Sequence, residues 1–479
     1  MTIDDTSSEA KVSTGIAGVP QLGAPPAPAT MASVKRRLLK GGAWALTGQV
    51  GGLLAGMISS ILLARILSPD DLGAYFLALS IVMTASQFAL FGLPQTVVRF
   101  VAKSMAIGKP GRARKSIEYA FASATAGAIM AGLIVYLAGD WLGGTVFQSS
   151  ILKSTMGLVA LWTTPSAFRT LIAESFRGFQ DIRLASIFGG FSFKTISTIL
   201  FLWIWITRGQ TSLTTLLVLV ILATTFPAIS GGTFLIRKVR TLGTSAPVSR
   251  RAMLDMAFPL FIMSVAVFGL KQSSLWITGA YLPENQVALF GAAMRLVIMM
   301  AMPLSLVNAV VPPIIAEMHA QDRRRDLERT LRMVSTIGGI PAVAVLLVFI
   351  FSGKPLLGLV YGEYYRQAAV VLAILSMGQL VNVWSGSCGF ALMMTGNHMI
   401  MTIITVTFGV ANVVISIFVI PRYGITGAAI AWSASLITQN IVTVLITKRY
   451  LGVWTHVSFL MLNDFMKIYQ KFAIERKRI

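Results

Sequence analysis

The sequence predicts an all-α membrane protein with about twelve transmembrane helices, in two parallel six-helix bundles around a central cavity. Three observations predict this class. First, 55% of the 479 residues are hydrophobic and only 12% are charged, about half the charged share of a soluble domain. Second, apolar runs of about 20 residues recur along the chain, and this length crosses a bilayer as a helix. Third, Lys and Arg concentrate in alternate loops.

Each apolar run is expected to be one spanning helix. The bilayer core holds no water to hydrogen-bond backbone N–H and C=O groups, so only helices or closed barrels cross it. These runs are too long and too continuously apolar for barrel strands. The expected spans are 42–64, 72–96, 116–138, 152–173, 185–207, 212–235, 256–279, 287–312, 333–352, 368–393, 399–420 and 427–447. The first six predict an N-terminal bundle over 34–240 and the last six a C-terminal bundle over 241–450.

The two ends of the chain are expected to lie outside the bundles. Residues 1–33 are rich in Ser, Ala, Pro, Gly and Thr, a composition that predicts a disordered cytoplasmic tail. Residues 451–479 mix aromatic and basic side chains, which predicts an amphipathic helix on the anionic cytoplasmic leaflet. A frayed basic tail is the alternative for this second segment.

The positive residues predict the orientation. With the N-terminus inside, 31 of the 40 Lys and Arg residues fall in the two tails and the even-numbered loops, 6 in the other loops and 3 within spans. The loop after the fourth span is assigned Arg169, Arg177 and Arg183. Because cytoplasmic loops carry an excess of Lys and Arg, both termini are expected in the cytoplasm of a bacterial inner membrane. The same rule accounts for the net charge of +22 without a nucleic-acid partner.

A weak internal repeat relates the two predicted halves. The stretch LSPDDLGAYFLALSIV (67–82) is similar to LPENQVALFGAAMRLV (282–297), at an offset of 214 residues. Each copy lies between the first two helices of a half and runs from outside to inside. The halves are therefore expected to be parallel repeats about an axis normal to the membrane, which can enclose a central site and rock about it. Chance similarity among apolar residues is the alternative.

The motifs of enzymes and of metal or nucleotide binding are absent from the sequence. No Walker-type phosphate loop and no nucleophile elbow occurs. The histidines His319, His398 and His456 have no metal-ligand spacing, and the single cysteine, Cys388, excludes an internal disulfide. We therefore predict no catalytic residue, no metal and no cofactor.

Charged residues inside the spans are the candidate substrate-binding groups. Lys271, Arg295 and Lys194 lie within spans seven, eight and five, with no acidic residue at comparable depth. Buried charges in a membrane are costly and usually face a cavity or a partner, so these three predict a cationic lumen that binds phosphates. Snorkelling or pairing with a helix-end carbonyl is the alternative for both lysines. Arg99, at the end of span two, either gathers a headgroup or anchors the topology.

Uncharged polar residues also recur within the spans and have two readings. They either hydrogen-bond a neighbouring helix or line a wet cavity for sugars. The predicted cavity-lining set is Gln49, Gln87, Gln272, Asn308, Gln379 and Asn382.

Four segments resemble a known family, the polysaccharide-biosynthesis flippases of the MOP exporter superfamily. Residues 38–82 resemble its opening, with a basic lead-in, an apolar helix, a short turn and a second helix. Residues 113–122 and 423–435 resemble the starts of its third and twelfth helices, and residues 174–187 resemble the connection before its fifth helix. The turn is carried by Ala64, Arg65, Leu67, Pro69, Asp71, Gly73 and Tyr75.

The resemblance implies a V-shaped pair of six-helix bundles that moves an undecaprenyl-pyrophosphate-linked oligosaccharide repeat unit, by alternating access, for exopolysaccharide or O-antigen synthesis. It implies that the lipid-linked oligosaccharide and membrane lipids are partners, with the polysaccharide polymerase and export machinery as further candidates. The chain departs from the pattern at 208–217, which lacks the Gly-rich start seen at helix twelve.

Other functions compete with this one. A cation-coupled multidrug exporter of the same superfamily would favour acidic residues at mid-depth, where this chain has basic ones. A peptidoglycan-precursor flippase differs only in the headgroup it selects. A membrane polysaccharide polymerase or ligase would be expected to have a large outer loop with catalytic groups, which the sequence lacks.

Overall fold

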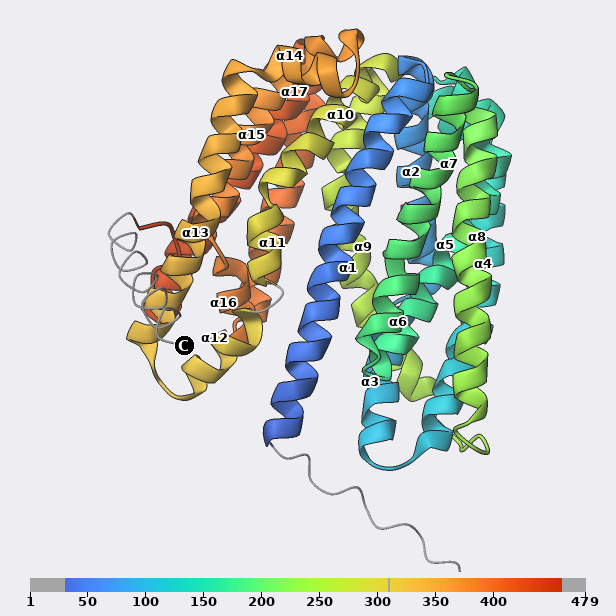
Figure 1. Cartoon of the computed structure of the whole chain (residues 1–479), viewed down its shortest axis with the longest axis vertical. Coiled ribbons are helices and arrows are strands. Elements are labelled where there is room, and N and C mark those ends of the chain that lie inside the picture. Colours follow the sequence, from blue (N-terminus) through green and yellow to red (C-terminus); the bar gives the residue numbers. More distant parts are fainter. Residues whose placement is uncertain (1–30, 309–310, 459–479) are drawn as a thin grey trace, which may run out of the picture.

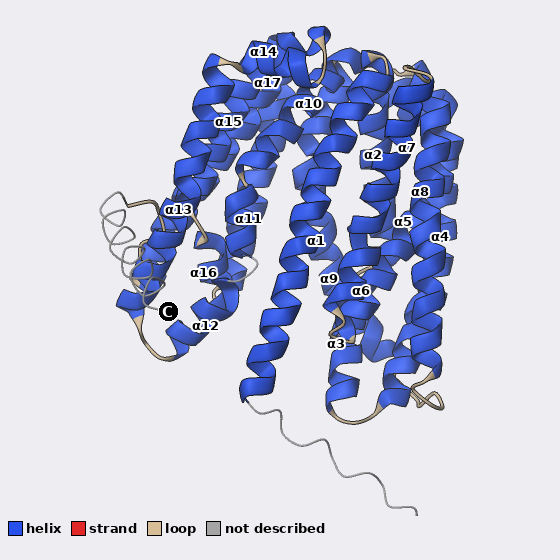
Figure 2. Cartoon of the chain, viewed as in Figure 1, coloured by secondary structure: helices blue, strands red, loops and turns tan. Residues whose placement is uncertain are grey.

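The computed structural model describes residues 31–308 and 311–458, without the side chains of 31–47 and 49 (Figure 1). All regular elements of these residues are helices (Figure 2). The first part of the chain forms α1 (Met31–Ile66), α2 (Pro69–Leu90), α3 (Leu93–Ala106), α4 (Pro110–Leu137), the π-helix η1 (Trp141–Val146), α5 (Ser150–Gly178), α6 (Ile182–Ser186), the π-helix η2 (Ile187–Phe191), α7 (Ser192–Thr207) and α8 (Leu213–Arg240). The all-α prediction is confirmed.

The second part of the chain continues in the same way. It forms α9 (Arg250–Tyr281), α10 (Glu284–Met300), α11 (Met302–Asn308), α12 (Val311–Ala320), α13 (Arg324–Phe351), α14 (Gly353–Val360), the 3-10 helix η3 (Glu363–Ala368), α15 (Ala369–Ser385), α16 (Cys388–Met394) and α17 (His398–Leu451). Within the described ranges, eight helical stretches are long and apolar enough to cross a membrane, and α10 with α11 makes a ninth if this pair, bent by 53°, counts as one.

Local sequence explains where several helices start. At α2 the hydroxyl of Ser68 accepts a hydrogen bond from the backbone N–H of Asp71, and Pro69 occupies the first helical position. The serine cap pairs a backbone N–H that has no partner within the helix, and proline at the first helical position gives up no helical hydrogen bond. Ser149 and Ser212 cap α5 and α8 in the same way.

Three predicted spans are broken helices, and one of them is the span expected at 368–393, which is divided at Gly386 between α15 and α16. The span expected at 72–96 is α2 followed by α3, with left-handed backbone at Phe91 and Gly92 (φ 43° and 72°). A β-carbon at Gly92 would lie 2.2 Å from the carbonyl oxygen of Ala257, so α9 crosses too closely for any larger residue. The span expected at 287–312 is likewise divided, at Ala301.

The α17 helix contains a further break. It runs for 54 residues, and its backbone is non-helical at Gly424 (φ 58°, ψ −143°). About 20 residues are enough to cross a bilayer, so the two parts of α17 each have the length of one span. The left-handed φ explains glycine at this position.

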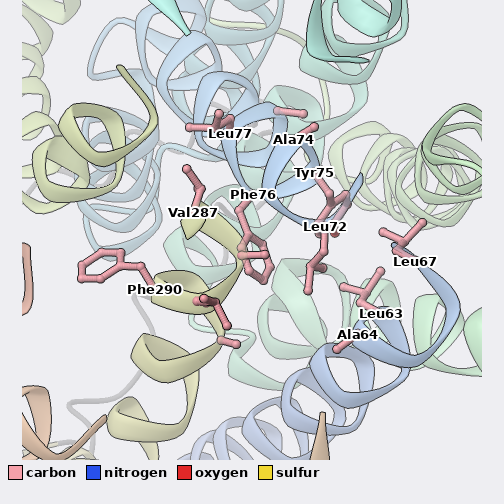
Figure 3. Close-up of a cluster of buried hydrophobic side chains, with 14 of the residues drawn as sticks. Leu63, Ala64, Leu67, Leu72, Ala74, Tyr75, Phe76, Leu77, Val287 and Phe290 are labelled. Atoms are coloured by element: carbon pink, nitrogen blue, oxygen red, sulfur yellow. The ribbon is translucent and has the colours of Figure 1, made fainter. Parts of the chain in front are cut away.

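The α2 and α10 helices meet at one end of the molecule, the upper end in Figure 1. A β-carbon at Gly73 would lie 1.8 Å from the carbonyl oxygen of Glu284, and one at Gly291 would lie 2.2 Å from the ring of Phe76. Figure 3 shows Phe76 and its neighbours in this core, with Val287 and Phe290 contributed by α10. Two segments that were matched as a repeat therefore pack directly on each other.

The described part of the C-terminal segment is not the predicted amphipathic helix. Residues 452–458 are non-helical and largely buried against α13 and α15. The carbonyl of Thr455 accepts from the hydroxyl of Ser335, and the N–H of Val457 donates to the carbonyl of Trp384. These bonds hold the segment in an extended path that a helix could not follow. Residues 459–479 of that prediction, and 1–30 of the predicted N-terminal tail, lie outside the described residues, while 31–33 already belong to α1.

Candidate functional site

Three basic side chains from three helices lie near one another, and we call them the cation cluster: Arg169, Lys194 and Arg295. Lys194 is central, because it lies close enough to both Arg169 and Arg295 for the like charges to repel. The structure thus brings two of the predicted phosphate-binding residues together and adds Arg169, which the sequence interpretation had left out.

Lys194 projects from α7 against a glycine-lined stretch of α1. A β-carbon built at Gly52 or at Gly56 would lie 3.8 or 3.7 Å from the Lys194 ammonium. Residues four apart share one face of a helix, so these two glycines leave the face open for the lysine. At 1.5 Å per residue, Lys194 lies about 20 Å from the end of α7 at Thr207, well inside a bilayer of about 30 Å.

Arg295 is half-buried on α10 among aromatic rings. Its guanidinium carbon is 4.3 Å from the centroid of the Phe76 ring, which is a cation–π distance. Tyr75 and Tyr361 lie close enough for their hydroxyls to interact with its charge. Arg295 lies about 17 Å along α10 from its start at Glu284, again at mid-depth.

Arg169 lies within α5, so its assignment to a cytoplasmic loop is wrong. The helix continues to Gly178 because Leu171, Ile172 and Phe176 are buried against the neighbouring helices. Arg169 donates to the carbonyl of Gly189, in the π-helix η2. Its guanidinium carbon is 5.2 Å from the Phe193 ring, and its Nε is buried without a hydrogen-bond partner.

The cation cluster has no acidic partner within the described part of the chain. In residues 31–308 and 311–458, no carboxylate oxygen lies within 4.0 Å of any of its three side chains. Cations on apolar helices are costly unless water or an anion compensates them. The arrangement is therefore suited to receive an anion, with Arg295 able to bind a phosphate in bidentate fashion.

Two predicted substrate-binding residues stand apart from this cluster. Lys271 on α9 and Arg99 on α3 both have exposed side chains. Neither makes a hydrogen bond, ion pair or ring contact with another described residue. Their predicted roles in phosphate binding stay predictions.

The six predicted cavity-lining residues are dispersed. Asn308 and Asn382 line a pocket of about 310 Å³ between α11, α15, α16 and α17. Gln379 is buried and does not line this pocket, and Gln87 and Gln272 are half-buried elsewhere. Gln49 lies in α1, but its side chain is outside the described set.

Polar contacts close the end of the molecule at which α2 and α10 meet. Arg65, at the end of α1, donates to the carbonyls of Leu359 and Val360 at the end of α14. The hydroxyls of Ser60 and Tyr361 are 3.4 Å apart. Trp276 on α9 donates to the hydroxyl of Ser80 on α2 at 2.8 Å. These bonds join elements that lie about 200 to 300 residues apart in sequence.

The family comparison matches more than half of the chain. The family described as "Polysaccharide biosynthesis protein" matches residues 38–319. A curated relative, the capsular polysaccharide biosynthesis protein CapF of Staphylococcus aureus, is 24% identical over 129 residues, which are 27% of this chain and 33% of CapF. The chain thus spans about a third of the length of the curated relative it matches. The resemblance found in the sequence is confirmed by the family match.

Solved structures give the fold. An inward-facing multidrug resistance MATE family transporter of the MOP superfamily superposes with a TM-score of 0.70 at 14% identity, covering 84% of this chain and 94% of that one. The lipid II flippase MurJ, in an inward closed conformation, superposes with a TM-score of 0.61 at 13% identity, covering 84% and 87%. Together with the apolar helices, this likeness makes the chain a multi-pass membrane protein of that fold.

Proposed function

Because the chain belongs to the polysaccharide biosynthesis protein family, we propose that it is a flippase for a lipid-linked oligosaccharide. Its substrate is an undecaprenyl-pyrophosphate-linked repeat unit, moved from the cytoplasmic to the periplasmic leaflet of a bacterial inner membrane for exopolysaccharide or O-antigen synthesis. The observation that carries this proposal is the cation cluster, which has no acidic partner among the described residues and lies at mid-depth between apolar helices.

Charge explains why such a substrate needs such a cluster. A pyrophosphate carries more than one negative charge, and moving even one charge into hydrocarbon costs several kcal/mol or more. Arg169, Lys194 and Arg295 supply three positive charges from α5, α7 and α10. The headgroup crosses beside them in water, while the isoprenoid tail stays in the bilayer.

We also propose that the helices form twelve spans in two bundles of six. The N-terminal bundle consists of α1, α2 with α3, α4, α5, α6 to α7, and α8. The C-terminal bundle consists of α9, α10 to α12, α13, α15 with α16, and the two parts of α17 on either side of Gly424. This division is supported by the broken helices, whose parts together reach the length of a span.

The structure corresponds to the inward-open state in this proposal. Hydrogen bonds from Arg65 and Ser60 join the two bundles at the end that the charge distribution assigns to the periplasm. Opening there and closing at the other end would expose the cation cluster to the opposite side, as in alternating access between two repeats. In Figure 1 the ribbons of α11, α12, α13 and α16 diverge from those of α3 to α8 toward the lower end, while α9 stays beside α3.

The cation-coupled multidrug exporter is the less favoured function. Cationic drugs would require acidic groups at mid-depth, and the cluster is positive. A peptidoglycan-precursor flippase shares the pyrophosphate chemistry and differs in the sugar.

The experiment is a deletion strain complemented with variants. Accumulation of lipid-linked sugar intermediates on the cytoplasmic leaflet, relieved by the wild-type gene and not by Arg295→Gln, supports the proposal. Arg422→Gln removes an exposed arginine of α17 and serves as the matched control that complements fully. Unchanged intermediates in the deletion strain would refute flipping. Immunoblots must show every variant in the membrane, so that a failure to complement reports a loss of function.

A further inference from the structure

The pocket between α11, α15, α16 and α17 lies in the C-terminal part of the chain, away from α5 and α7 of the cation cluster. It is lined by sixteen residues, none of which carries a charge. Its volume of about 310 Å³ is at the lower end of the range of small-ligand pockets. We call it the amide pocket, because Asn308, Asn382, Gln439 and Asn440 all line it.

Several amide groups of the pocket are free to bind a ligand. Asn308 accepts a hydrogen bond from Ser387 at 2.6 Å, and Asn440 donates to the carbonyl of Leu436 at 2.9 Å. The side chains of Asn382 and Gln439 make no hydrogen bond with another described residue. An amide offers two donors and one acceptor, so these two residues bring both kinds of group to the pocket wall.

The pocket lies where two helices are broken. Ala301 separates α10 from α11, and Gly386, with φ 68°, separates α15 from α16. A β-carbon at Gly386 would lie 1.8 Å from the hydroxyl oxygen of Ser335, so the break is fixed by close packing. Discontinuous helices in transporters typically form binding sites, because irregular backbone is tolerated where it lines a cavity.

The composition of the pocket selects the kind of ligand. Uncharged amides and hydroxyls pair with the hydroxyl and acetamido groups of sugars, and they supply no positive charge to balance a phosphate. The side chains of Phe390, Met393 and Met401 line the same pocket and offer apolar contacts for the C–H face of a sugar ring.

We propose that the amide pocket binds the first uncharged sugars of the substrate, while the cation cluster holds its pyrophosphate. This inference rests on the proposed function and adds to it a division of the headgroup between two separate sites. The cation cluster, drawn from α5, α7 and α10, recognises charge and is indifferent to the sugar, and the amide pocket recognises the sugar.

The test uses the full-length protein in lipid nanodiscs and two ligands. One is bare undecaprenyl pyrophosphate, and the other is the sugar-bearing lipid purified from the deletion strain. Asn382→Leu and Gln439→Leu each remove hydrogen bonds at nearly constant size. Thr438→Leu is the matched control, because Thr438 precedes Gln439 on α17, is exposed and does not line the pocket.

Each pocket variant is expected to weaken binding of the sugar-bearing lipid by about 3- to 10-fold, the effect of one or two lost hydrogen bonds. Binding of bare undecaprenyl pyrophosphate stays unchanged, and Thr438→Leu matches the wild type with both ligands. Equal weakening of both ligands, or no weakening of the sugar-bearing one, would overturn the inference. Failure of the wild type to bind either ligand would instead overturn the proposed function, and this inference with it.

Discussion

The contact of Gly73 with α10 is expected to control opening at the upper end of Figure 1. An alanine at Gly73 would place its β-carbon 1.8 Å from the carbonyl oxygen of Glu284, whereas ordinary contacts begin at 3.4 Å. The helices α2 and α10 would have to separate by about 1.6 Å, the difference between these two distances. Overpacking of this kind costs about 1–3 kcal/mol, and the cost falls on the closed arrangement alone.

Gly73→Ala should therefore raise the ratio of open to closed protein about 5- to 150-fold, since 1.4 kcal/mol is a factor of about ten. The reporter is Ser80→Cys in a Cys388→Ser background, because Ser80 is buried beside Trp276 when this end is closed. The rate of labelling with a membrane-impermeant maleimide measures the open fraction.

The control for this prediction is Gly269→Ala in the same background. A β-carbon at Gly269 has no neighbour within 4 Å, so helix packing is unaffected. Labelling should equal that of the parent protein. If Gly73→Ala also labelled at the parent rate, with normal amounts of protein in the membrane, the packing of α2 on α10 would not be what keeps this end closed.

Three further predictions concern the cluster, the closing bonds and the topology. Arg169→Gln should lower transport, measured by complementation, while Arg169→Lys retains part of it, because the cluster needs the positive charge. Equal loss of transport in both variants would assign Arg169 a packing role. Arg65→Gln should raise labelling of the Ser80→Cys reporter, because the bonds to the carbonyls of Leu359 and Val360 are lost; an unchanged rate would exclude a closing role. A cysteine at Asp70 should react with reagents from outside the cell and one at Arg112 only from inside, and reversed labelling would overturn the proposed orientation.

Local patterns in the sequence predicted much of the fold. The apolar runs that predict the helices depend only on the residues within each run. The prolines Pro94 and Pro303 indicate interruptions in spans two and eight, and the breaks at Gly92 and Ala301 lie two residues before them. The close crossing of α9 at Gly92 could not be predicted, because it joins residues far apart in the chain.

The candidate site was harder to predict for the same reason. Arg295 and Lys194 could be singled out, because a charge inside an apolar run is visible in the sequence. Arg169 was missed because it was counted with the loop after the fourth span, although the span expected at 152–173 already contains it. In the structure α5 extends to Gly178, so Arg169 lies well within the helix. The amide pocket joins residues as far apart as Ala301 and Thr443, a proximity that no local pattern contains.

The most direct test of the account is an experimental structure of the protein with its lipid-linked pyrophosphate bound. We expect density for the two phosphates within about 3 Å of the Arg295 and Lys194 nitrogens, the length of a charge-assisted hydrogen bond. Phosphates found against other residues, with Arg295 still stacked on Phe76 and no anion beside it, would contradict the claim that these cations carry the headgroup across the membrane.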